Sequence, residues 1–92
     1  MSNNISFKNR DRFIQLGIAI ASLRKIRELS QKQLAEKANI SRSHLSSIEA
    51  PNIVRPFSLE ILFNIADALE IEVEELLKAS MFPDHILMCT KQ

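Results

Sequence analysis

Histidine and cysteine, the side chains most typical of zinc sites, are scarce in this chain, and their spacing does not fit a metal site or a catalytic centre. The candidates are two histidines and one cysteine: His44, His85 and Cys89. Structural zinc sites usually take four ligands from two closely spaced pairs, and two histidines forty-one residues apart plus one cysteine lack that arrangement. Gly17 is the only glycine, which excludes a glycine-rich phosphate loop. We therefore expect no metal, no cofactor, no catalytic residue and no enzymatic activity.

Serine is the other reactive residue type, and its positions match helix capping rather than catalysis. Ser30 is followed three residues later by Gln33, a pattern in which the two side chains satisfy free N–H groups at a helix start. Ser41 precedes a second helical pattern, and Asn39 tolerates the left-handed conformation that ends a helix. With only residues 39–41 between them, these two short helices must cross steeply, as in a helix-turn-helix. A generic helical hairpin is the alternative that this pattern leaves open.

The spacing of apolar residues predicts five helices and no strand. They cover about residues 10–28, 31–39, 42–50, 59–69 and 73–79. Asn9 or Asp11 would cap the first helix. A chain of 92 residues with 46% hydrophobic residues suffices for one compact domain, so we expect an all-α bundle. The lone cysteine allows no intramolecular disulfide, and without an apolar run long enough to cross a bilayer we expect a cytoplasmic protein.

The helix predicted after Ser41 has two dissimilar faces. With about 100° of rotation per residue, Leu45 and Ile48 share one side. The opposite side carries small residues: Ser43, Ser46, Ser47 and Ala50. A helix face that contacts only solvent would more usually carry Glu and Lys. Small polar side chains instead allow the backbone of a helix to enter a groove on a binding partner. In the last two helices, we expect the core to receive Leu59, Leu62, Ile65, Leu69, Leu76 and Leu77.

Charge is divided unevenly along the chain. Residues 1–55 contain ten Lys or Arg and four Asp or Glu, a net of +6, whereas residues 56–92 contain two and seven, a net of −5. Together these give the overall charge of +1. A basic half is typical of a surface that faces a polyanion. The alternative is a pair of solvated surfaces without a partner.

Several short motifs occur in a characteristic order between residues 16 and 77. They are Leu16-Gly17-x-x-Ile20, Leu23-Arg24, Leu29-Ser30-Gln31-x-x-Leu34-Ala35, Ile40-Ser41-x-x-x-Leu45-x-x-Ile48-Glu49, Arg55-Pro56 and Ile65-Ala66-x-Ala68-Leu69. This ordered set resembles the lambda-repressor-like (Cro/Xre-type) helix-turn-helix regulators of bacteria and phages. The resemblance implies a bundle of about five helices whose third helix lies in the DNA major groove.

The resemblance also implies roles for individual residues. Base-reading positions in and around the third helix match Arg42, Ser43, His44 and Ser47, although a phosphate contact is equally open for Arg42. Phosphate-contacting positions match Gln31, Asn52 and Arg55, and the glutamine also braces the recognition helix. Lys25, Arg27 and Lys32 add to the positive field. Members of the family commonly pair the positions of Arg24 and Glu49, so we expect a buried ion pair between the first and third helices.

Two departures from the family pattern affect turns. Many relatives have glycine at the positions of Glu28 and Glu70, so these bends must form with a residue other than glycine. Where many relatives have Glu-x-Gly after the third helix, this chain has Glu49-Ala50-Pro51-Asn52, which stiffens the loop.

The expected organisation is an N-terminal arm at residues 1–9, a helix-turn-helix DNA-binding domain at 10–79 and a C-terminal tail at 80–92. For the arm, the alternatives are a contact along DNA and a solvated terminus. The function we expect is transcriptional regulation, as a repressor that binds double-stranded DNA at a two-fold operator, with no membrane partner. One alternative is the antitoxin of a toxin–antitoxin pair, which would hold a toxin protein. The other is a protein-interaction or coactivator module that reads no bases.

Apolar residues beyond those needed for the bundle predict a homodimer. In the first helix these are Ile14, Ile18 and Ala21, and in the tail they are Phe82, Ile86, Leu87 and Met88. A small domain rarely leaves so much apolar surface bare. We expect the tail and the last helix to form the dimer contact, the alternative being that the tail covers its own subunit.

Overall fold

The structure, a computed structural model, describes residues 7–52 and 54–80. This part consists of five helices: α1 Phe7–Ile26, α2 Gln31–Ala38, α3 Arg42–Glu49, α4 Leu59–Ala68 and α5 Val73–Ser80. No strand occurs among the described residues. The expected all-α bundle is confirmed, and none of these five helices has both the length and the hydropathy needed to span a membrane.

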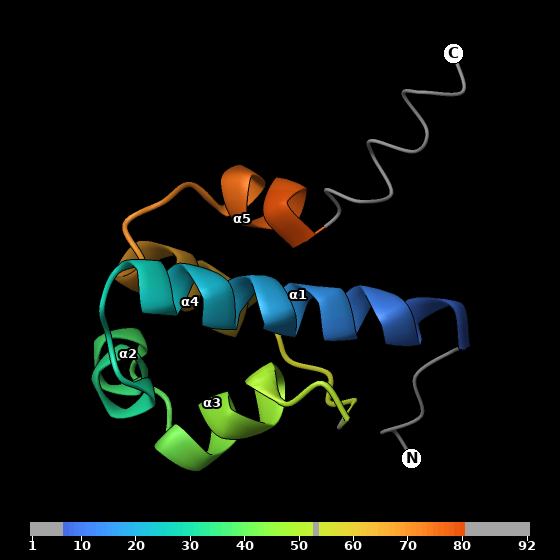
Figure 1. Cartoon of the computed structure of the whole chain (residues 1–92), viewed down its shortest axis with the longest axis horizontal. Helices are drawn as coiled ribbons and strands as arrows, with labels where there is room; N and C mark the ends of the chain where they lie inside the picture. The colour runs from blue at the N-terminus through green and yellow to red at the C-terminus, as the bar shows by residue number, and fades with distance from the viewer. Residues whose placement is uncertain (1–6, 53, 81–92) are drawn as a thin grey trace.

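The long helix α1 organises the bundle (Figure 1). α5 packs along one side of α1, and α3 packs against it from the opposite side. α2 contacts both α3 and α4, and α4 contacts α5. This arrangement places α2 and α3 together on the side of the molecule away from α5.

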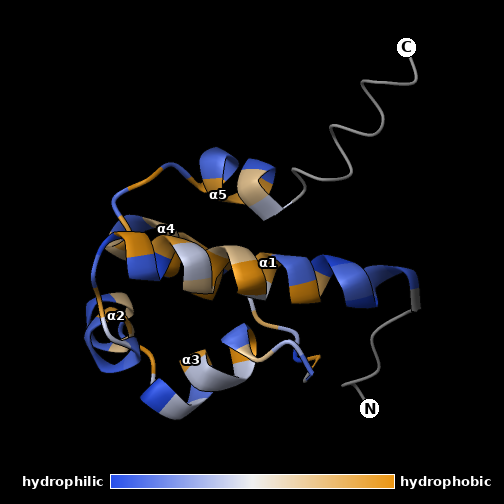
Figure 2. Cartoon of the chain, in the orientation of Figure 1, coloured by the Kyte–Doolittle hydropathy of each residue, from blue (hydrophilic) through white to orange (hydrophobic). Residues whose placement is uncertain are grey.

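Every helix contributes at least one large apolar side chain to a single core. The fully buried ones are Ile20, Leu34, Leu45, Ile65, Leu69 and Leu76. Figure 2 shows the same organisation, with hydrophobic residues where the helices face one another and hydrophilic ones along the outer side of α2. Burial of one such side chain contributes about 1.5–3 kcal/mol, so the core fixes the relative positions of α1, α2 and α3.

Two residues expected in the core lie at the surface instead. Leu59 is 66% exposed and Leu77 is 40% exposed. Leu59 is the first residue of α4, and Phe57 from the preceding segment packs against the core near that helix start. In α5 the buried positions Leu76 and Ser80 are four residues apart and share one line along the helix, which leaves Leu77 at its edge.

α1 begins at Phe7, earlier than the expected start near residue 10. Asn9 therefore lies inside the helix, where its Oδ1 accepts a hydrogen bond from Arg12 Nη1 at 3.1 Å, and neither Asn9 nor Asp11 is the cap. Lys and Arg have good helix propensity, which favours this extension. Outside the described residues lie the remaining arm at 1–6 and the tail from 81 onward, including His85, Cys89 and the apolar residues Phe82, Ile86, Leu87 and Met88.

Three helices end in the same backbone motif without using glycine. Glu28, Asn39 and Glu70 have φ angles of 60°, 60° and 62°, in the left-handed region. At each end, the N–H of this residue and that of the next residue donate to carbonyls of the last helical turn, as in a Schellman motif. The next residues are all apolar and pack against the core: Leu29, Ile40 and Ile71. Their burial holds each turn in place, and the expected non-glycine bends at Glu28 and Glu70 are confirmed.

Candidate nucleic-acid interface

α2 and α3 are short helices whose ends are fixed by side chains. Ser30 Oγ accepts a hydrogen bond from the Gln33 backbone N–H at 3.0 Å, and Gln33 Oε1 accepts one from the Ser30 N–H at 2.8 Å. Ser41 Oγ accepts from the His44 N–H at 3.0 Å. The predicted capping box and cap are both confirmed. Because only residues 39–41 separate the two helices, their crossing is set by these caps and by the left-handed Asn39.

α3 buries one face and exposes the other, as its sequence predicts. Leu45 and Ile48 are buried against the core, whereas Ser43 and Ser46 on the opposite side are exposed. The side of α3 opposite its buried face therefore carries short polar side chains. Short side chains allow a binding partner on this side to approach the helix backbone closely.

The four residues with expected base-reading roles all lie on α3. Arg42 and Ser43 in its first turn are exposed, and His44 and Ser47 are half-buried. Ser47 Oγ donates a hydrogen bond to the Ser43 carbonyl at 3.1 Å. With its proton used inside the helix, the Ser47 hydroxyl is left with acceptor capacity toward an outside donor.

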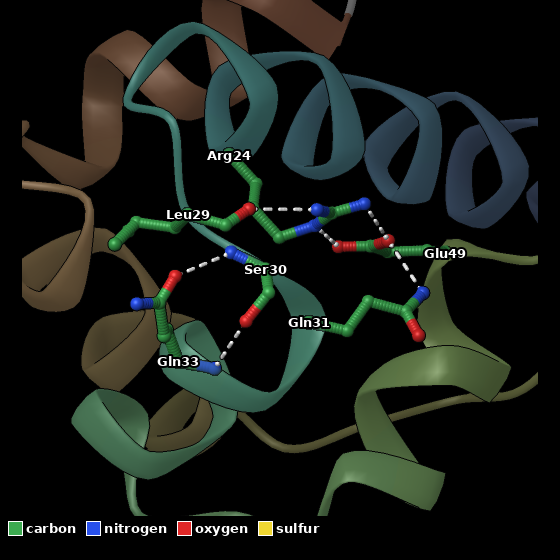
Figure 3. Close-up of polar contacts among 6 residues, drawn as sticks. All are labelled: Arg24, Leu29, Ser30, Gln31, Gln33 and Glu49. Atoms are coloured by element: carbon green, nitrogen blue, oxygen red, sulfur yellow. Dashed lines mark hydrogen bonds and ion pairs between the residues drawn. The ribbon is translucent and has the colours of Figure 1, made fainter.

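A buried ion pair joins α1 to the end of α3. Arg24 Nε lies 2.8 Å from Glu49 Oε2, and Arg24 Nη2 donates to Glu49 Oε1 at 3.0 Å (Figure 3). The two side chains are only 11% and 5% exposed. The structure thus brings together the two residues that the family resemblance pairs. Arg24 Nη1 also donates to the Leu29 carbonyl at 2.8 Å, which ties the same guanidinium to the backbone just before α2.

Gln31 extends this network from α3 to α2. It is the first residue of α2, and its Nε2 donates to Glu49 Oε1 at 2.9 Å (Figure 3). Gln31 is half-buried. The contact physically links the start of α2 with the last residue of α3, where the family resemblance expects a brace to the recognition helix.

Gly17 allows α1 and α3 to approach closely. A Cβ atom at this position would overlap the carbonyl oxygen of Ile48 and lie 3.2 Å from its carbonyl carbon. Any larger residue at position 17 would push the end of α3 away from α1. The depth at which α3 sits on the bundle therefore depends on this glycine.

The remaining phosphate candidates lie in the segment after α3. Asn52 and Arg55 are both exposed there, and no hydrogen bond joins either one to Gln31 within the described ranges 7–52 and 54–80. The segment leaves helical geometry at Ala50, which has φ −73° and ψ 120°, as expected for a residue before proline. Phe57 anchors its far end through an edge-to-face contact with Phe13 of α1, the ring centroids being 5.6 Å apart.

Comparison with known proteins assigns this arrangement of helices to a family. The sequence matches the Helix-turn-helix family over residues 20–76, more than half of the chain. The chain belongs to this family. The matched range contains α2, the turn, α3 and the Arg24–Glu49 pair, and the resemblance to Cro/Xre-type regulators is confirmed.

Individual relatives include a phage protein and two regulators of known structure. The immunity repressor protein of Bacillus phage phi105 is 48% identical over 61 residues, covering 66% of this chain and 41% of the phage protein, so the chain spans about two fifths of that relative. The restriction-modification controller protein C.AhdI from Aeromonas hydrophila shares 33% identity over 70% of this chain and 94% of its own, with a TM-score of 0.65. The master regulator for biofilm formation SinR, solved in complex with DNA, shares 37% identity over 67% and 97%, with a TM-score of 0.61.

This helix-turn-helix protein also has a contact that the sequence did not reveal. Arg27, expected only to add to the positive field, donates from Nε to the Leu69 carbonyl at 2.8 Å and from Nη2 to the Glu70 carbonyl at 3.4 Å. It therefore binds the free carbonyls at the end of α4. Cations are favoured at helix C-termini, but no local pattern indicates which distant arginine reaches one.

Proposed function

We propose that this helix-turn-helix protein is a sequence-specific DNA-binding transcriptional regulator that acts as a repressor. The observation that carries the proposal is the outer face of α3, where serines stand in place of long charged side chains. Such a face lets the helix approach base edges in the major groove, as recognition helices of this motif do. The inner face is held by the buried Arg24–Glu49 pair, so α3 would enter the groove as a rigid element.

The distribution of exposed charge supports the same orientation on DNA. In α2, α3 and the segment after α3, the exposed basic residues are Lys32, Lys37, Arg42 and Arg55, and the exposed acidic residue is Glu36. Exposed acidic residues of α4, α5 and their connection are Glu60, Asp67, Glu70, Glu72, Glu74 and Glu75. A polyanion attracts the first surface and repels the second, and the release of counterions from phosphates would supply general affinity.

Within this proposal, the contacts divide between selectivity and affinity. Arg42, Ser43, His44 and Ser47 read base edges, and Gln31, Asn52 and Arg55 hold phosphates. The relatives support DNA binding and repression in general, because one is an immunity repressor and another was solved in complex with DNA. Repression would follow from occupancy, since a protein bound over a promoter blocks access of polymerase.

We also propose that the chain binds its operator as a homodimer through α5 and the tail. In the described part, Ile18 of α1 is 41% exposed and Leu77 of α5 is 40% exposed, and the two helices pack together. Exposed apolar side chains on adjacent elements favour association. Two recognition helices related by a two-fold axis would then read half-sites about one DNA turn apart.

Selection from a pool of random duplex DNA, followed by sequencing, tests the function. We expect enrichment of a single motif with two-fold symmetry, and sedimentation should show a dimer. Ser46→Glu should abolish enrichment because it places a negative charge on the outer face of α3. Ser22→Glu, the same change at an exposed position of α1, is the matched control and should preserve it. Failure of the wild-type chain to enrich any motif would reject the proposal.

A further inference from the structure

The carboxylate of Glu49 accepts three hydrogen bonds from two different helices. Arg24 supplies two of them, one to each oxygen, and Gln31 supplies the third to Oε1. No buried side-chain nitrogen or oxygen in the described part lacks a hydrogen-bond partner, so the network is complete. Glu49 is therefore the point at which α1, α2 and α3 are joined by polar contacts (Figure 3).

The chemistry of Glu49 determines how the Gln31 amide is oriented. An ionised carboxylate only accepts hydrogen bonds, whereas a carboxamide has one accepting oxygen and one NH2 group with two donors. The NH2 group of Gln31 faces Glu49. The opposite orientation would place Oε1 of Gln31 against a carboxylate oxygen and lose the bond, so the carboxylate selects one orientation.

This orientation leaves a second donor on the same nitrogen. One N–H of Gln31 Nε2 is taken by Glu49 at 2.9 Å, and no second partner of this nitrogen occurs among the described residues. Gln31 is also the first residue of α2, where backbone N–H groups favour an anion. A phosphate oxygen at this place could accept hydrogen bonds from the Gln31 side chain and from free backbone N–H groups of the first helical turn.

We propose that Glu49 is a positioning residue for DNA binding, which holds the Gln31 amide so that its remaining N–H faces a backbone phosphate. The inference rests on the proposed function and deepens it. Because Glu49 is also the last residue of α3, one carboxylate sets both the phosphate contact and the recognition helix. Glu49 itself touches no DNA and acts through Gln31.

A double-mutant cycle measured on DNA affinity tests the proposal. The probe is the duplex enriched from random DNA by the wild-type chain. Gln31→Ala should weaken binding by about tenfold, the loss of roughly one charge-assisted hydrogen bond. Glu49→Gln should weaken binding by about threefold in the wild-type background and by less than about 1.5-fold in the Gln31→Ala background, because coupled residues are not additive. An equal loss in both backgrounds would show that Glu49 acts only through overall structure.

The direction of the effect separates positioning from simple electrostatics. Neutralising a carboxylate near DNA removes a repulsion, so charge alone predicts tighter binding by Glu49→Gln. Glu36→Gln is the matched control, since Glu36 is exposed on the same helix as Gln31. We expect the control to bind equally well or more tightly and Glu49→Gln to bind more weakly. Tighter binding by both variants would overturn the proposal.

The wild-type protein provides a readout that does not depend on any variant folding. In its nuclear magnetic resonance spectrum, one Nε2 proton of Gln31 should exchange slowly with solvent while the other exchanges fast. Adding the selected duplex should shift the fast proton and leave the slow one in place. Two equally fast protons, or no shift on adding the duplex, would reject the positioning role. If no duplex is enriched at all, the proposed function fails together with this inference, whereas enrichment with an additive cycle rejects only the role of Glu49.

Discussion

α3 and α4 are constructed alike but present different outer faces. Each starts at a serine cap, with Ser41 Oγ accepting from the His44 N–H at 3.0 Å and Ser58 Oγ from the Ile61 N–H at 3.2 Å. Each buries leucine and isoleucine side chains in the same core. Yet α3 exposes serines, whereas α4 exposes large apolar residues, among them Phe63, which is 47% exposed.

This difference shows that the buried face and the outer face of a helix carry separate information. The buried pattern decides how the helix sits in the bundle, and either helix satisfies that requirement. The outer face determines which kind of partner surface the helix can bind. α3 suits a DNA groove lined with polar base edges, and α4 suits an apolar protein surface. Changes to the two helices should therefore affect different properties of the protein.

The largest effect is expected where α3 is attached to α1. Glu49→Ala should lower the free energy of unfolding by about 3–5 kcal/mol, because it leaves the Arg24 charge buried without its partner. Glu60→Ala, which removes an exposed carboxylate from α4, should cost less than about 0.5 kcal/mol. Denaturant titration measures both. The double replacement of Arg24 and Glu49 should cost less than the two single changes added, and strict additivity would mean that the pair contributes nothing.

Changes to the outer faces should separate the two helices by DNA selectivity. Ser47→Ala or Arg42→Ala should alter the preferred operator, since a lost base contact costs about 1–3 kcal/mol of discrimination. Phe63→Ala, a truncation on the outer face of α4, should leave the preferred sequence unchanged. Competition binding against operators with single base changes checks the three variants. An unchanged preference after joint replacement of Ser43, His44 and Ser47 would contradict the role of α3.

Loss of the serine cap should destabilise the protein equally for α3 and α4, so the effects of the two changes on DNA binding can be compared directly. Ser41→Ala and Ser58→Ala should each lower the free energy of unfolding by about 1 kcal/mol through loss of a capping hydrogen bond. Only Ser41→Ala should also weaken operator binding measured well below the melting temperature, because only its helix is proposed to enter DNA. Equal losses of affinity would mean that DNA binding follows global stability alone.

The smallest effect is expected in the segment between the two helices. Arg55→Ala should weaken binding to all duplexes alike and reduce the log–log salt slope by roughly one unit, since it removes the proposed phosphate contact. Binding isotherms at several salt concentrations measure the slope. A change in the preferred sequence would instead place Arg55 among the base-reading residues.

Local signals in the sequence predicted much of the framework. The capping box at Ser30, the left-handed turn at Asn39 and the inward Leu45 and Ile48 of α3 follow from rules that act within a few residues. These rules are reliable because the hydrogen bonds concerned join near neighbours in the chain. The fold and the buried end of α3 could therefore be described before the structure.

Features that depend on distant partners were harder to predict. Whether an apolar side chain is covered depends on the neighbouring helix, which is why Leu59 and Leu77 were wrongly expected in the core. The contact of Arg27 with the Leu69 carbonyl joins residues far apart in the chain, and no periodic pattern indicates it. The bond from Gln31 to Glu49 likewise required the crossing angle of two helices. Base and phosphate roles on the surface remain predictions, since they depend on a partner.

The left-handed helix ends determine where this chain should tolerate glycine, and the close approach of α1 and α3 determines where it should not tolerate its loss. Glu28 and Glu70 adopt a backbone that disfavours residues other than glycine by roughly 1–2 kcal/mol, and they are held there by the packing of the next residue. Glycine at either position would relieve that strain while making the unfolded chain more flexible. At Gly17 the situation is reversed, because even one added methyl group would meet the Ile48 carbonyl. Substitution by glycine should therefore be tolerated at Glu28 and Glu70, where helices end. Replacement of Gly17, where α1 and α3 cross, should not be tolerated.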